Sequence, residues 1–165
     1  MLIALSQGYL FDLDGNAKGS KTKTGLDSAI IHQLLENGEY VKILDLLQSL
    51  DYKRHEQRRN VHLNIGLTYM YMKDYALARK AFVAGKVHAQ SDDSMNDSLM
   101  FLLELGNLCL IQGDYNGCLK ANFDVLHKLY PTKNMSLVTK FGLQKYSGIA
   151  VNRLSTFLFL IGNNE

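Results

Sequence analysis

The sequence predicts an all-α fold built from antiparallel helical hairpins. Its 165 residues correspond to about one domain, and apolar residues recur at helical spacing from residue 24 onward, with turn residues at nearly every break. Three similar turn triplets follow one another at intervals of 35 and 40 residues: Gly38-Glu39-Tyr40, Lys73-Asp74-Tyr75 and Gly113-Asp114-Tyr115. A period in this range, with two helices in each unit, is typical of helical solenoids.

Residues 1–23 are predicted to form a short N-terminal arm or β-hairpin in front of a helical domain that spans residues 24–165. Residues 1–5 and 9–13 are apolar runs that favour strands, and Asp14-Gly15-Asn16 favours a turn between or after them. A Lys-rich stretch of Gly, Ser and Thr follows, and its composition is that of a linker.

Each turn triplet separates two helical patterns and so predicts one hairpin. The first hairpin combines the apolar positions of residues 29–35 and 43–50, and the second combines residues 55–72 and 78–87. The polar break Ser91-Asp92-Asp93-Ser94 offers good N-cap residues before the third hairpin. Its helices are expected over residues 100–111 and 118–129, and Pro131 is expected to end the second of them.

The second and third hairpins resemble the tetratricopeptide repeat family. In the second, Ile65-Gly66 and Tyr69, then Asp74-Tyr75, Ala78 and Phe82, match the family's large-small pair, aromatic, turn, small and aromatic positions. The third matches through Leu105-Gly106, Gly113-Asp114-Tyr115 and Cys118, whereas Asn122 stands where a large aromatic is usual and Phe123 is expected to compensate. The resemblance covers residues 24–130 and implies hairpins stacked as a short right-handed solenoid. We expect Gly66 to face Ala78 and Gly106 to face Cys118, so that paired helices approach closely.

The C-terminal segment resembles the start of another unit. Residues 154–164 echo residues 105–114, as though a first helix began without its partner. Its apolar side chains surround most of the predicted helix, which is more than one packing face can hide. We therefore expect this helix to mediate self-association as a homodimer, with Phe157 and Phe159 in the contact.

The first helices of the hairpins are expected to line the inner face of such a solenoid. Family members that clamp a terminal carboxylate use Lys, Arg and Asn on this face, whereas here Asn60 and Asn107 are the amides and most other positions are apolar. The face therefore predicts binding of an apolar or amphipathic segment of another protein. The alternative is that the chain itself fills the groove, with residues 135–146 or the N-terminal arm. The predicted partner-binding residues are His32, Leu35, Asn60, Leu63, Leu67, Met70, Tyr71, Met100, Leu103, Asn107, Leu110 and Ile111.

Composition argues against several classes of partner and compartment. The formal net charge of +2 lacks the strong positive field of a nucleic-acid binder. No apolar run reaches the length of a membrane helix, and residues 1–11 lack the basic start and cleavage site of a secretory signal. Two cysteines need no oxidising compartment. These features favour a cytoplasmic protein.

Sequence motifs for catalysis or metal binding are weak. Asp12 and Asp14 resemble the nucleophile motif of haloacid dehalogenase-type phosphatases, but a helical chain lacks the rest of that fold, so a β-turn at Asp14-Gly15 is favoured. A calcium loop is disfavoured because no Glu closes it, and the five histidines lack zinc-site spacing. We expect no metal and no cofactor.

Two further clusters each have a plain structural interpretation. Cys109 and Cys118 lie on facing helices of the third hairpin, where a disulfide is conceivable but small core residues are favoured. Lys53, Arg54, Arg58 and Arg59 form a basic patch that could meet an acidic peptide or phosphate, although a solvated helix start is favoured.

The functional prediction is a non-enzymatic protein-binding module. The family resemblance implies an adaptor, or a protein similar to the bacterial secretion chaperones of this family, that holds an apolar segment of its partner. The unfinished C-terminal unit supports the alternative of a sensory or dimerisation domain in a larger regulatory protein. A phosphatase that uses Asp12 and Asp14 is the third hypothesis.

Overall fold

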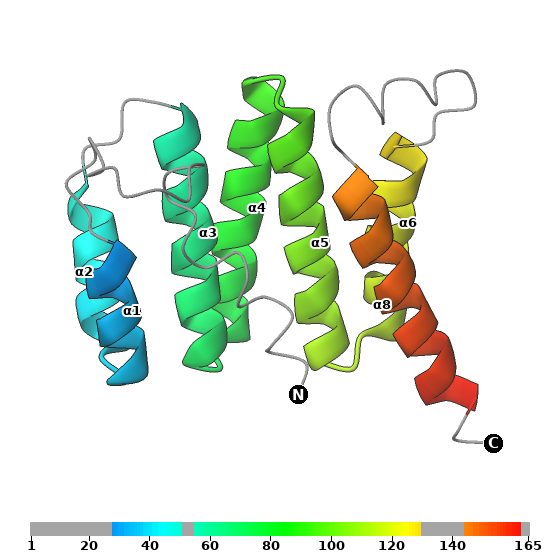
Figure 1. The fold of residues 1–165 in the computed structure, drawn as a ribbon, viewed down its shortest axis with the longest axis horizontal. Helices are drawn as coiled ribbons and strands as arrows, with labels where there is room; N and C mark the ends of the chain where they lie inside the picture. The colour runs from blue at the N-terminus through cyan, green and yellow to red at the C-terminus, as the bar shows by residue number, and fades with distance from the viewer. Residues whose placement is uncertain (1–27, 51–54, 130–143, 163–165) are drawn as a thin grey trace. The chain divides into compact units, whose positions relative to one another are not determined.

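The computed structural model describes residues 28–50, 55–129 and 144–162, and every regular element in these ranges is an α-helix (Figure 1). The all-α prediction is therefore confirmed for this part of the chain. The predicted N-terminal arm, with Asp12 and Asp14, and the helix stop at Pro131 lie outside it. No helix in the described ranges combines the length and the apolar character that a membrane span requires.

The chain divides into two compact units, Met1–His88 and Ala89–Glu165. The first unit contains α1 (Ser28–Glu36), α2 (Tyr40–Ser49), α3 (His55–Tyr71) and most of α4 (Tyr75–Ser91). The second unit contains α5 (Met95–Ile111), α6 (Tyr115–Leu129) and α8 (Gln144–Gly162). Equivalent helices of the second and third hairpins are offset by 40 residues, since α3 begins at His55 and α5 at Met95, and α4 begins at Tyr75 and α6 at Tyr115.

The three predicted turns share one backbone geometry, in which one residue adopts a positive φ. That residue is Gly38 (φ 70°), Lys73 (φ 61°) or Gly113 (φ 73°). In each turn the amide of this residue donates to the carbonyl three residues earlier. The amide of the following residue donates to the carbonyl five residues earlier, for example from Asp74 to Tyr69 (2.9 Å) and from Asp114 to Cys109 (2.9 Å). These are the two bonds that satisfy the last carbonyls of a helix in a Schellman motif.

The residue after the positive-φ position caps the next helix in the second and third hairpins. Asp74 Oδ1 accepts a hydrogen bond from the Leu77 amide (3.1 Å), and Asp114 Oδ1 accepts one from the Gly117 amide (2.9 Å). Glu39, at the same position in the first hairpin, makes no side-chain cap bond and pairs with Lys42 instead. The shared cap explains why Asp follows the positive-φ residue in both of these turns.

Gly66 and Gly106 mark the close contacts within the hairpins, but their partners differ from the predicted ones. The nearest atoms to a Cβ built at Gly66 belong to Phe82 rather than to Ala78. At Gly106 they belong to Ala121 and Asn122 rather than to Cys118. At both glycines the nearest side chains therefore belong to residues three or four positions farther along the second helix than predicted.

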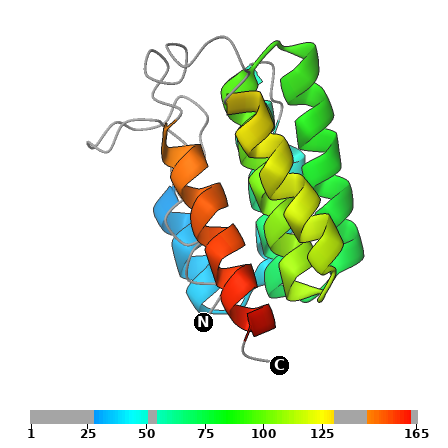
Figure 2. The ribbon, with the colours of Figure 1, turned by 90° about the vertical axis from the view of Figure 1, so that its right-hand side faces the viewer.

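Each unit has its own apolar core. In the first unit Ile31, Ile43, Leu47 and Val61 join α1, α2 and α3. In the second unit the core joins α5 and α6 with α8, and Figure 2 shows α8 lying beside these two helices. The buried residues of this second core are Leu99, Leu102, Leu103, Val125, Leu129, Tyr146 and Ala150.

Candidate partner-binding face

In the first unit, the predicted partner-binding residues lie on α1 and α3, and most of those described are buried. The exposed fractions of Leu63, Leu67 and Met70 are 5%, 2% and 9%, and Asn60 is also buried. Leu35 and Tyr71 are half-buried, and the side chain of His32 lies outside the described part. The four buried residues of α3 thus differ from the expectation of an open groove.

In the second unit, the chain itself covers part of the predicted face. Leu103 lies in the same core as Tyr146 and Ala150 of α8, and Met100 packs against that core. Asn107 and Leu110 are buried as well, whereas Ile111 is half-buried. Tyr146 is the last residue of the 135–146 segment that the alternative names as filling the groove, and residues 135–143 lie outside the described part.

Three half-buried positions of the predicted face, Leu35, Tyr71 and Ile111, lie near the ends of the first helices, whereas the half-buried Met100 does not. Tyr71 is the last residue of α3, and Ile111 is the last residue of α5. In the first unit Tyr71 stacks on Tyr40, with ring centroids 6.2 Å apart, and Tyr40 and Leu35 pack on the same core. Leu35 and Tyr71 therefore lie together with Tyr40. In the sequence, Tyr40 is assigned only to a turn.

A buried ion pair in the second unit was not predicted from the sequence. Arg153 of α8 and Glu104 of α5 approach to 3.7 Å, and each side chain is only 6% exposed. The Arg153 guanidinium also donates to the carbonyl of Leu103, so it holds α8 against α5. Glu104 and Arg153 occupy the same position in their helices, since each lies nine residues after the first residue, Met95 of α5 or Gln144 of α8. An alignment of α8 with α5 in the sequence could therefore have indicated the pair.

The surroundings of Glu104 oppose its ionisation. Burial raises the pKa of the Glu104 carboxyl, while the nearby charge of Arg153 and, to a smaller extent, Asn107 counteract that rise. Glu104 Oε2 has no hydrogen-bond partner within the described residues. The carboxylate therefore depends on Arg153 for its stability as an ion.

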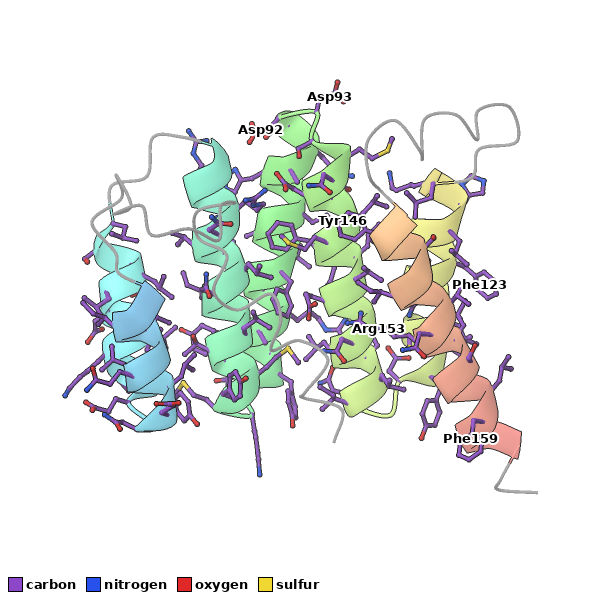
Figure 3. All side chains as sticks on the ribbon, in the orientation of Figure 1. Asp92, Asp93, Phe123, Tyr146, Arg153 and Phe159 are labelled. Atoms are coloured by element: carbon purple, nitrogen blue, oxygen red, sulfur yellow. The ribbon has the colours of Figure 1, made fainter. Side chains whose placement is uncertain are left out.

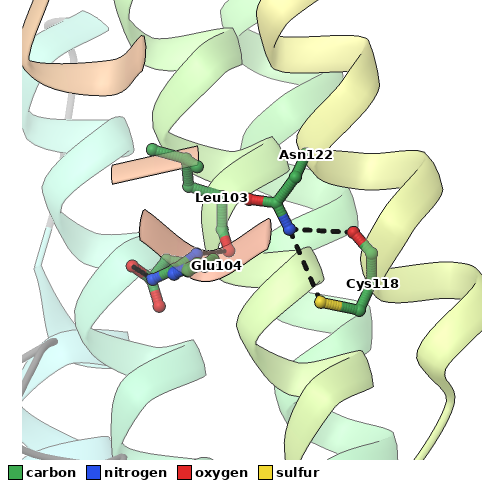
Figure 4. Close-up of polar contacts among 5 residues, drawn as sticks. Leu103, Glu104, Cys118 and Asn122 are labelled. Carbon is green, nitrogen blue, oxygen red and sulfur yellow. Dashed lines mark hydrogen bonds and ion pairs between the residues drawn. The ribbon is translucent and has the colours of Figure 1, made fainter. Parts of the chain in front are cut away.

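The two cysteines are buried free thiols. Asn122 donates to the Cys118 carbonyl (2.8 Å) and contacts its sulfur at 3.5 Å (Figure 4). Burial raises the pKa of the Cys118 thiol, which disfavours the reactive thiolate. Asn122 is itself fully buried, whereas Phe123 is 57% exposed, so Phe123 does not take the place of the missing aromatic residue.

Two histidines of the first unit stack between α3 and α4. The rings of His62 and His88 have centroids 5.0 Å apart. Burial, and secondarily the neighbouring His88, lower the pKa of His62 below its ordinary value of 6.5. The folded state therefore binds fewer protons at His62 than the unfolded state does near that pH.

Acidification is expected to destabilise the fold through His62. Because the folded pKa is lowered, the stabilising contribution is present above about pH 6.5, the unfolded pKa, and is lost as the pH falls below it. Urea unfolding followed by circular dichroism at neutral and mildly acidic pH should show a smaller loss of stability in His62→Gln than in the wild type. His127→Gln, at an exposed position of α6, is the control and should behave as the wild type does. An equal loss in all three proteins would contradict this role of His62.

The described residues contain no group of three or more His, Cys, Asp or Glu side chains that could hold a metal ion. Of the basic patch, Lys53 and Arg54 lie outside the described part, and Arg59 donates to Asn60 Oδ1 (3.0 Å). Comparison of the chain with models of protein families, with curated proteins and with solved structures found no match. The function is therefore inferred from the structure itself.

Proposed function

We propose that this chain is a tetratricopeptide-like helical repeat, arranged as a short right-handed solenoid, and that it is a non-enzymatic adaptor or chaperone that binds another protein. One observation carries the proposal: the hairpins α3–α4 and α5–α6 repeat at an offset of 40 residues with the same turn and the same Asp cap. Repeated hairpins of this kind present their first helices side by side as an extended binding surface.

The side chains of this surface favour an uncharged, apolar or amphipathic segment as the ligand. The half-buried members of the predicted face, Leu35, Tyr71, Met100 and Ile111, carry no charge. Tyr71 and Ile111, at equivalent helix ends, and Leu35 keep part of their surface accessible. In the first unit Leu35 and Tyr71 can hold one apolar anchor of a peptide, and in the second unit Ile111 can hold another.

Selection from a displayed library of short random peptides tests this proposal, because it samples many candidate ligands at once. We expect enrichment of peptides with apolar anchors, and binding measured by fluorescence anisotropy with a selected peptide. Tyr71→Glu and Ile111→Glu should each raise the Kd by about tenfold or more, because a charge would enter an apolar contact.

The control is Val87→Glu, which places the same charge at a 56% exposed position of α4. It should leave the Kd unchanged. Met70→Glu is not a useful variant because Met70 is buried and its replacement would unfold the first unit. Failure to enrich any peptide, or equal binding by Tyr71→Glu, Ile111→Glu and the wild type, would contradict the proposal.

A further inference from the structure

The outer face of α8 is the most unusual surface of the second unit. It consists of Gly148, Val151, Ser155 and Leu158, which recur at heptad spacing, and all four are exposed. Val151 is 51% exposed and Leu158 is 65% exposed. Phe159, which borders this face, is 69% exposed, and Figure 3 shows it near the C-terminal end of the helix. The side chain of Phe157 lies outside the described part.

The equivalent face of α5 is covered by an antiparallel helix. Arg153 and Glu104 occupy the same position in α8 and α5 and are 49 residues apart. At the same separation, the four residues of the outer face of α8 correspond to Leu99, Leu102, Gly106 and Cys109 of α5. Leu99 and Leu102 share a core with Val125 and Leu129 of α6, and Gly106 lies against Ala121 and Asn122. In α5 this face is therefore a helix-packing surface, and in α8 the corresponding face has no such cover among the described helices of the second unit.

Charge also distinguishes this face from an ordinary solvent-exposed helix face. The charged residues of α8 are Lys145 and Arg153, and the latter is buried against α5. When a surface pairs with the same surface of a second copy, charges of one sign on it repel each other. Such a surface must therefore be uncharged or carry equal numbers of positive and negative charges. The Ser155 hydroxyl donates to the Val151 carbonyl within the helix (2.9 Å), so its burial would leave no unsatisfied donor.

We propose that the outer face of α8 pairs with the same face of a second copy of this chain, in an antiparallel arrangement with two-fold symmetry. Gly148 and Leu158 lie five residues on either side of position 153, and Val151 and Ser155 lie two on either side. One antiparallel register therefore places Leu158 of each copy against Gly148 of the other, and Val151 against Ser155. Each large side chain meets a small one, as close helix packing requires.

Light scattering of the full chain tests the pairing. We expect a dimer at micromolar concentration, and Leu158→Glu and Val151→Glu should each raise its dissociation constant by at least about a hundredfold, because each would bury a charge in an apolar helix contact. The matched control is Phe123→Glu on α6, which charges another exposed apolar position of the same unit and should remain dimeric. Circular dichroism of the monomeric variants should show unchanged helicity.

Cysteine cross-linking tests the register. The double variant Gly148→Cys with Leu158→Cys should form a covalent dimer under mild oxidation, whereas either single variant should not, because an antiparallel pair holds identical positions several turns of helix apart. A parallel pair would cross-link through the single variants and would overturn the proposal. A monomeric wild type, or a dimer that persists in folded Leu158→Glu, would also overturn the proposal. A monomer whose melting temperature falls in Leu158→Glu would overturn it too, because that result would mean that the chain covers this face itself.

Discussion

Arg153→Met is expected to lower the free energy of unfolding of the second unit by about 3 to 5 kcal/mol. The change leaves the Glu104 carboxyl without its 3.7 Å partner and the Leu103 carbonyl without its donor, both inside the α5–α8 contact. Since burial already raises the pKa of Glu104, the loss should shrink as the pH is lowered and Glu104 takes up a proton. Urea unfolding at two pH values measures both effects.

Two further variants show whether this loss comes from the buried charge. The double variant Glu104→Leu with Arg153→Met should recover most of the lost stability, because it leaves no charge in the core. Lys120→Met, which removes a charge from an exposed position of α6, should change stability by less than about 0.5 kcal/mol. If Arg153→Met cost no more than about 1 kcal/mol, the pair would behave as a solvent-exposed one and this view of the α5–α8 contact would be wrong.

Gly66→Ala is expected to destabilise the first unit by about 3 kcal/mol. A Cβ at this position would lie under 3.0 Å from three carbons of the Phe82 ring, and Phe82 is fully buried, so the ring cannot move aside. The usual gain of about 1 kcal/mol for replacing a helical glycine with alanine is too small to offset this overlap. Thermal and urea unfolding of the variant provide the measurement.

Gly106→Ala is the matched comparison because Gly106 occupies the equivalent position of α5. Its Cβ would meet Asn122 Nδ2 at 3.0 Å and the Ala121 Cβ at 3.2 Å, a milder overlap than at Gly66. The change in stability should be less than about 1 kcal/mol, because the gain in helix propensity offsets the contact. Equal effects of the two variants would show that Phe82 does not set the distance between α3 and α4.

The helices and their turns could be predicted from the sequence because both depend on local signals. The period of the apolar residues indicates which face of each helix is buried, and Gly38 and Gly113 indicate turns that require a positive φ. Asp74 and Asp114 report caps through hydrogen bonds to amides three residues away. Lys73 adopts the same positive φ without being glycine, and only the neighbouring Asp-Tyr pair indicates the turn there.

The partners of buried residues could not be predicted in this way. Whether Gly66 meets Ala78 or Phe82 depends on where two helices cross, and a shift of one turn leaves the apolar pattern unchanged. Leu103 has the same character whether a ligand or α8 covers it. The Glu104–Arg153 pair joins residues 49 positions apart, and nothing local to either residue indicates the other.

Nuclear Overhauser effects measured on the full chain test the claim that α3–α4 and α5–α6 are two copies of one hairpin. We expect cross-peaks between the Gly66 Hα protons and the Phe82 ring, and between the Gly106 Hα protons and the Asn122 side-chain amide, which are equivalent contacts in the two hairpins. Cross-peaks of Gly66 with Phe82 but of Gly106 with a residue one turn away, such as Cys118, would show that the two hairpins pack in different registers and would contradict the claim.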